Sequence, residues 1–270
     1  SQSTGVSSQK RPKPCLISVG SGSMQLALIK NMGFDNDYFT SGNWITHPTQ
    51  GILNTYYWAR KYYSRLIKRY ISHGKVLEIG CGFGDLLHHL ETTHRTYGVE
   101  VSKYACDQAR RRTPKSEIMN RDAYDHLRNT PDSFYDAVIQ ICVLPHLDEP
   151  ALVLGEIGRV TRKDGIFLSV VPNPDYPLNR IKGHLSAMYV DKTHKYLYGT
   201  GQWIELTRSC GFEIVRRGST GLWDVPYLPL IPGFLQLVLF GWPSALQVVS
   251  GRIILPPWLG VDLIMIGVKR

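Results

Sequence analysis

The segment Val76-Leu77-Glu78-Ile79-Gly80-Cys81-Gly82-Phe83-Gly84 decides the fold. Residues 75–79 form a short apolar run that stops at glycines, and residues 85–91 have the pattern of a helix. The first glycine allows a sharp turn, and the other two let a ligand lie against bare backbone near a helix N-terminus. The segment therefore predicts a strand, a ligand-binding loop and a helix.

Strand and helix patterns continue to alternate outward from this segment as far as residue 171. Apolar runs predict strands, and the segments between them predict helices, at 96–101, 103–112, 117–120, 136–141, 150–161 and 165–171. A helix at 201–210 and strands at 212–216 and 261–268 follow. Regular alternation of this kind is typical of a parallel sheet covered on both faces.

The chain of 270 residues divides into five parts by composition. We expect a disordered tail, an N-terminal cap with a helix at 52–71, a ligand-binding core, an apolar insert and a last core strand, at 1–14, 15–72, 73–218, 219–260 and 261–270.

The insert carries no charged residue between Val225 and Gly251. That length suffices for a membrane span of about 20 residues, but prolines at 226, 229, 232 and 243 interrupt it. A shorter helix near 234–240 is the prediction, in a segment that covers a substrate pocket or contacts a membrane surface.

Composition limits the class of protein. The hydrophobic fraction of 43% permits a packed core, and the net charge of +9 favours nucleic acid, an anionic membrane or a phosphate-bearing substrate as partner. The cysteines are odd in number and never spaced as Cys-x-x-Cys, at positions 15, 81, 106, 142 and 210. We therefore expect reduced thiols in the cytoplasm, no disulfide framework and no metal site.

Acidic residues accompany the glycines. Glu78 lies two residues before Gly80, which suits a cationic ligand and disfavours a diphosphate. Glu100 ends the second strand, where a carboxylate can accept hydrogen bonds from both hydroxyls of a ribose. Asp122 follows the third strand and is placed to meet an adenine amino group. The pattern G-x-G-x-G differs from the dinucleotide and P-loop patterns.

These runs together resemble the class I S-adenosylmethionine (SAM)-dependent methyltransferases of the UbiE-like, type 11–12 group. The resemblance rests on VLEIGCGFG, YGVEVS, NRDAYD, DAVIQICVLPHLDEPALVLGEIGRVTRKDGIFLSVVPN and DKTHKYLYGTGQWIELTRSCGFEI, and covers about residues 70–217 and the last strand. It implies an α/β, Rossmann-like fold: a seven-stranded, mostly parallel sheet with an antiparallel last strand and helices on both faces. The N-terminal helical cap and the long apolar insert before the last strand are additions.

The resemblance implies SAM as cofactor and S-adenosylhomocysteine as product. The residues it places around SAM, from the methionine end through ribose and adenine to the sulfonium, are Glu78, Gly80, Cys81, Gly82, Gly84, Glu100, Val101, Asp122, Ala123, Ile141 and Cys142. The group often has Glu before the His of its fourth motif, whereas here Pro145 precedes His146, which leaves the role of His146 open.

Two histidines are candidate general bases, because methyl transfer to oxygen requires removal of a proton. His194 follows Asp191 in the spacing Asp-x-x-His, where the carboxylate can orient the imidazole, and His146 follows the fourth strand. Another group, or no base at all, stays open. Candidate acceptor contacts come from the 52–71 helix and the 172–190 loop: Tyr57, Trp58, Arg60, Tyr176, Arg180 and Tyr189.

We expect O-methylation of a small-molecule, glycan or lipid-linked acceptor by a cytoplasmic protein. Peripheral contact with an anionic membrane at its inner face, through 219–260 and basic residues, fits the apolar insert and the net charge. An RNA methyltransferase is the first alternative, although no added RNA-binding module is evident. A dinucleotide-binding oxidoreductase, which the glycine spacing and Glu78 disfavour, is the second, and a non-catalytic SAM-binding or membrane-scaffold protein is the third.

Overall fold

The structure is a computed structural model that describes residues 39, 55–183, 186, 189, 191–222, 225–228 and 230–270. The predicted tail at 1–14 and most of the 15–54 segment lie outside the described residues, so the disordered tail stays a prediction.

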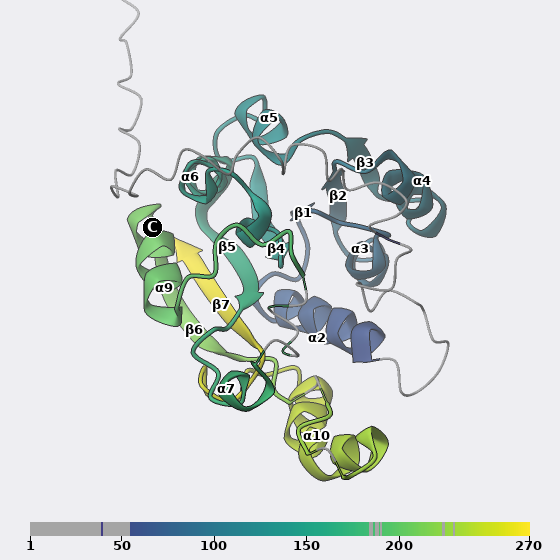
Figure 1. Ribbon diagram of the computed structural model, residues 1–270. Coiled ribbons are helices and arrows are strands. Elements are labelled where there is room, and N and C mark those ends of the chain that lie inside the picture. The colour runs from purple at the N-terminus through teal and green to yellow at the C-terminus, as the bar shows by residue number, and fades with distance from the viewer. Residues whose placement is uncertain are drawn as a thin grey trace, which may run out of the picture.

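A seven-stranded sheet forms the centre of the molecule, in the order β3-β2-β1-β4-β5-β7-β6 (Figure 1). Its strands are β1 (Lys75–Ile79), β2 (Arg95–Glu100), β3 (Glu117–Asn120), β4 (Tyr135–Ile141), β5 (Thr161–Pro172), β6 (Phe212–Ser219) and β7 (Asp262–Lys269). β7 runs antiparallel to both β5 and β6, and the pairs from β3 to β5 are parallel. The predicted sheet with its antiparallel last strand is therefore confirmed.

Helices cover both faces of the sheet. One face carries α5 (Ala123–Arg128), α6 (Pro150–Val160) and α9 (Thr200–Ser209), and the other carries α2 (Thr55–Tyr70), α3 (Asp85–Leu90) and α4 (Lys103–Arg112). Alternate residues of each strand supply the two cores: Phe167 of β5 packs with Trp203, while Leu168 packs on the side of Leu66. This alternation is the period of two that a strand imposes.

The observed bounds differ from the predicted ones in three core elements. Helix α5 was not predicted. Strand β5 begins at Thr161 and not at the predicted residue 165, because the intervening segment forms an irregularity inside the strand, where Asp164 has a φ of 61° and the register with β4 shifts. Strand β6 continues to Ser219, three residues beyond its predicted end.

Helix α10 (Gly233–Ser250) is longer than the predicted helix at 234–240 and runs through Pro243. The prediction was wrong because the second half of the helix is held by its packing, with Ser244 and Gln247 each 1% exposed. By length and composition α10 could cross a membrane, and 28% of its residues are buried in the protein. In Figure 1 it stands at the edge of the molecule beyond α2.

Candidate active site

The glycine loop after β1 requires glycine at three positions. Gly80, Gly82 and Gly84 have φ values of 65°, 51° and 78°, in the region that other residues rarely adopt. A Cβ atom on Gly80 would lie 2.4 Å from Cγ2 of Val143, whereas one on Gly82 would meet nothing within 4 Å. The loop thus packs tightly against the chain after β4 on one side and opens into free space on the other.

That free space is a cavity of about 440 Å³ over the carboxyl ends of β1, β2 and β4, within the usual size range of small-molecule sites. Nine of the predicted cofactor residues line it: Glu78, Gly80, Cys81, Gly82, Glu100, Val101, Asp122, Ala123 and Cys142. Gly84 instead begins helix α3, and the Ile141 side chain packs in the core against the α2 side.

Glu100 anchors the loop from the end of β2. One carboxylate oxygen accepts a hydrogen bond from the Gly82 amide at 3.0 Å, and the other accepts one from the Ser102 amide at 3.0 Å. Burial raises the pKa of Glu100, and these amide bonds oppose the rise. Each oxygen has a second lone pair, so the carboxylate can still accept hydrogen bonds from a ligand.

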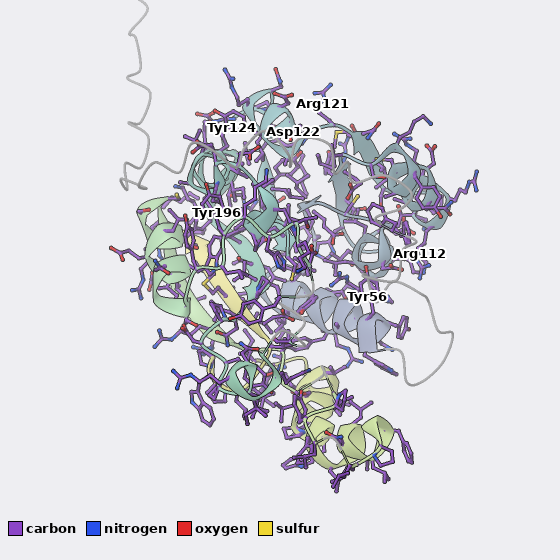
Figure 2. The ribbon with its side chains drawn as sticks, in the orientation of Figure 1. Tyr56, Arg112, Arg121, Asp122, Tyr124 and Tyr196 are labelled. Carbon is purple, nitrogen blue, oxygen red and sulfur yellow. The ribbon has the colours of Figure 1, made fainter. Side chains whose placement is uncertain are left out.

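Asp122 has a structural task that the sequence analysis missed. Its Oδ1 accepts hydrogen bonds from the amides of Tyr124 and Asp125, at 2.8 and 3.2 Å, and so caps α5. Arg121, Asp122 and Tyr124 line the cavity and lie together near α5, whereas Tyr56, which also lines it, lies apart from them on α2 (Figure 2). The cap fixes where the carboxylate stands at the predicted adenine end.

Glu78 tests whether the cavity fits a cationic cofactor. The side chain is 3% exposed, and its Oε2 has no hydrogen-bond partner among the described residues. Burial raises its pKa to about 8, although Arg60 opposes the rise. A buried acid with an unpaired oxygen at a cavity wall fits a ligand that brings a positive charge and N–H donors, as the ammonium group of SAM does.

Arg60 and Tyr56 reach the same wall from α2. The Arg60 guanidinium lies 4.2 Å from the centre of the Tyr56 ring, and both residues line the cavity. Although burial opposes it, the neighbouring Tyr56 and Glu78 raise the pKa of Arg60, so its charge is permanent. Arg60 was predicted as an acceptor contact, but beside Glu78 it is placed to hold a carboxylate of the cofactor. Tyr56 was missed, although it lies one turn before Arg60.

The two candidate bases come together with Asp191 at the other end of the cavity. His146, at the end of the 3-10 helix η2 (Leu144–His146), lines the cavity and is 7% exposed. The His194 ring stacks on it with centroids 4.6 Å apart. His146 Nε2 lies 4.0 Å from Asp191 Oδ2, so the carboxylate expected to orient His194 lies beside His146.

Thr193 connects His146 to Asp191. Its hydroxyl donates to Asp191 Oδ1 at 2.5 Å and lies 2.9 Å from His146 Nδ1. With the hydroxyl proton directed to Asp191, the His146 tautomer that carries a proton on Nδ1 completes the bridge by donating to the Thr193 oxygen. Burial lowers the pKa of His146 to about 4, with His194 adding to the effect and Asp191 opposing it. The ring is therefore neutral near pH 7.

The other predicted acceptor residues do not line the cavity. Tyr57 is exposed and packs edge to face on Trp58, which itself packs against the core on the α2 side, and Tyr176 is 1% exposed in the protein interior. Arg180, in the short helix α7 (Asn179–Lys182), and Tyr189 are exposed. Of the six residues, only Arg60 belongs to the cavity wall.

His146, Asp191 and His194 each offer a ligand atom, and these atoms lie within 4.8 Å of one another. The stacked arrangement of the two rings and the Thr193 bridge account for the cluster without a metal ion. That the protein holds no metal stays a prediction. The four cysteines of the described part are free thiols.

Comparison with known proteins agrees with this geometry. Residues 77–169 match the family model of the methyltransferase domain called Methyltransf_11. This segment is a class I SAM-dependent methyltransferase domain. The chain is 28% identical over 177 residues to a probable S-adenosylmethionine-dependent methyltransferase of Mycolicibacterium smegmatis, and the alignment covers 61% of this chain and 62% of the relative.

A second relative of the chain is the ubiquinone biosynthesis O-methyltransferase of Aeromonas salmonicida, which is 31% identical over 132 residues, or 45% of this chain and 55% of the relative. The chain thus spans less than two thirds of the length of either relative. A crystal structure of a SAM-dependent methyltransferase from Archaeoglobus fulgidus shares the fold, with a TM-score of 0.55 and 20% identity over 78% of this chain and 94% of that chain. The cofactor that the family implies is SAM.

Proposed function

We propose that the protein transfers the methyl group of SAM to a hydroxyl group of a small-molecule, glycan or lipid-linked acceptor. The observation that carries the proposal is His146: a neutral, buried imidazole at the cavity wall, with Asp191 4.0 Å from its Nε2. Such a pair is typical of a general base and the acid that stabilises its protonated form.

The cavity residues divide into two groups by role. Glu78 would hold the ammonium group of SAM, Arg60 its carboxylate, Glu100 its ribose and Asp122 its adenine. When bound, SAM supplies a methyl group attached to a positively charged sulfur. The fixed carboxylates and the glycine loop would hold SAM in the cavity whose wall also carries His146.

His146 is the proposed general base for the acceptor hydroxyl. His146 would take the proton that the acceptor hydroxyl releases on methylation, and SAM, when bound, would supply the methyl group and leave as S-adenosylhomocysteine with the electrons of the broken carbon–sulfur bond. Asp191 Oδ2, 4.0 Å from His146 Nε2, and the Thr193 hydroxyl, 2.9 Å from Nδ1, lie beside the imidazolium that would form. These contacts stabilise the charge that forms during transfer.

A hydrophobic or lipid-linked acceptor is favoured by the surface beyond the cavity. Helix α10 exposes large apolar side chains, and the protein has a net charge of +9. The proposal therefore includes a cytoplasmic protein that works at the inner face of a membrane. An RNA acceptor gains no support from the cavity wall, where Glu78, Glu100, Asp122, Asp148 and Glu149 are acidic.

The test is incorporation of radioactive methyl from SAM into cell lipid extract, glycans and RNA, with the products then treated with alkali. The proposal expects label in an alkali-stable methyl ether, and a loss of incorporation in His146→Ala. Label in an alkali-labile ester, in an amine or in RNA would contradict it. A protein that binds SAM but labels nothing would be the non-catalytic SAM-binding alternative.

A further inference from the structure

Helix α10 has the reverse arrangement of an ordinary amphipathic surface helix, because it buries its polar side and exposes its apolar side. Its polar side chains face the protein: Gln236, Ser244 and Gln247 are 0%, 1% and 1% exposed. At about 100° per residue these three positions share one side of the helix. Amphipathic surface helices normally bury the apolar side and expose the polar one.

Each buried polar side chain ties α10 to the protein by hydrogen bonds. Gln236 accepts from the amides of Tyr227 and Leu228 at 2.6 and 2.9 Å, and donates to the carbonyl of Ile231 at 2.6 Å. Gln247 donates to the carbonyl of Ser219 at 2.9 Å.

Gln247 also accepts from the amides of Ile254 and Leu255, at 2.8 and 3.0 Å. One face of the helix is thus fixed at both ends.

The opposite face is apolar and open. Phe234, Val238, Trp242 and Val249 are 64%, 71%, 64% and 72% exposed. Other exposed apolar side chains of the helix and its flanks are Leu230, Leu235, Leu239, Leu246, Ile254 and Trp258. A continuous exposed apolar surface of this extent marks a binding surface rather than ordinary scatter of single residues.

The charged residues of the described neighbouring helices, α2 and α7, are all basic. Neither α2 nor α7 contains an acidic residue, and residues 225–261 contain a single charged residue, Arg252. Arg65 and Arg69 of α2 donate to the carbonyls at the C-terminal end of α10, at 2.8 Å to Val248 and 2.7 Å to Gly251.

The basic border continues at the other half of the helix. Lys182 of α7 lies 5.3 Å from the ring centre of Tyr227, whose ring in turn packs on Phe240 of α10. An apolar face with a basic margin is the combination that binds the interface of an anionic bilayer.

We propose that the open face of α10 docks in the surface of an anionic membrane, with the helix parallel to the membrane plane. A spanning orientation would remove Gln236 and Gln247 from their partners and place both amides in hydrocarbon. Contact with a second copy of the chain would bring the two basic margins together, because a twofold contact pairs each surface with itself. An anionic bilayer satisfies both the apolar face and its margin.

This inference rests on the proposed function, in which the acceptor is linked to a lipid, and adds how the protein would reach the membrane. Its test uses no acceptor and no SAM. The parent protein is floated with vesicles of phosphatidylcholine alone and with equal parts of phosphatidylglycerol. We expect binding to the anionic vesicles only, weakened by salt. Failure to bind vesicles would overturn the inference and leave the proposed methyl transfer untouched. Protein that binds vesicles but transfers no methyl group would overturn the proposed function and leave the inference standing.

Matched variants assign the binding to this face. Val238→Asp, and separately Arg180→Glu with Arg252→Glu, should lower the vesicle partition coefficient by about tenfold or more. Arg111→Glu with Lys115→Glu makes the same change of charge on exposed residues of and after α4, and should alter it less than about twofold. Circular dichroism confirms that each variant is folded.

The depth of Trp242 decides the orientation. Its fluorescence, taken as the difference between the parent and Trp242→Phe, should be quenched most by lipids brominated near the head group. Strongest quenching by lipids brominated at the chain ends would contradict the in-plane helix. Equal binding to neutral vesicles, or a dimer in solution that Val238→Asp separates and that binds no vesicle, would also overturn the proposal.

Discussion

The cofactor cavity and helix α10 depart from ordinary burial in opposite directions. In the cavity, an ionisable side chain, Glu78, is 3% exposed and one oxygen lacks a partner within the described part of the chain. On α10, an aromatic side chain, Trp242, is 64% exposed. Each departure costs free energy in isolated protein, so each marks a place that a partner completes. A buried acid indicates a cation, and an exposed apolar face indicates an apolar phase.

The largest expected effect lies in the cavity, at His146. His146→Ala should lower kcat by about 10²- to 10⁴-fold, the usual contribution of a general base, with the Kd of SAM nearly unchanged. Single-turnover kinetics and calorimetry measure the two quantities. His194→Ala is the matched control, because His194 stacks on His146 but does not line the cavity. An equal loss in both variants would show that the stacked pair acts as a unit.

The second effect concerns Glu100. Glu100→Ala removes the acceptor of the Gly82 and Ser102 amides as well as the proposed ribose contact, and should weaken SAM binding by about 100-fold. Calorimetry measures it, with Glu117→Ala, an exposed acid on β3, as the control. If Glu100→Ala also lost vesicle binding, the cavity and α10 would not be independent sites, and the contrast between the two regions would not hold.

Glu78 gives the cavity a pH dependence that α10 lacks. Because its pKa is raised to about 8, the free protein holds it protonated at lower pH, and binding of a cation must release that proton. SAM affinity should rise by up to about tenfold per unit between pH 5.5 and 7.5. Calorimetry in buffers of different ionisation enthalpy should show release of nearly one proton, and none in Glu78→Gln. Affinity that is independent of pH would remove the basis for a cation at this wall.

The smallest expected effects are changes in the free energy of unfolding, and they test whether α10 buries its polar side and exposes its apolar side. Gln247→Leu makes the helix more apolar yet leaves three buried backbone groups without their partner, so the free energy of unfolding should fall by about 2 kcal/mol. Val238→Ser makes it more polar and should change that free energy by less than about 0.5 kcal/mol, because the side chain is 71% exposed. Urea denaturation measures both. The opposite order would place the apolar face inside the fold.

The sheet was predictable from the sequence because buried parallel strands are short apolar runs bounded by glycines and polar turns, as at Lys75–Ile79. Helix α5 was not, since Asp122 was interpreted only as a ligand contact and not as a helix cap. The full length of α10 was also hidden. Pro243 is a local signal to stop, whereas the burial of Ser244 and Gln247 that overrides it depends on distant segments.

The candidate site divides in the same way. Glu78, the glycines and Glu100 could be predicted because they follow consecutive strands, whose ends meet at one edge of a parallel sheet. The pairing of Asp191 with His146 rather than with His194 could not, since 45 positions separate them and Thr193 supplies the connection. The place of Arg60 beside Glu78 likewise depends on how α2 crosses the sheet.

Helix α2 contributes to both regions, since Arg60 lines the cavity and Arg65 and Arg69 hold the end of α10. At about 1.5 Å per residue, these arginines lie within roughly 14 Å of one another along a single rigid element. Two ligands that each favour a position of that element must influence each other to the same degree. If the proposed bilayer contact and SAM favour different positions of α2, the factor by which the bilayer changes the affinity for SAM is the factor by which SAM changes the affinity for the bilayer.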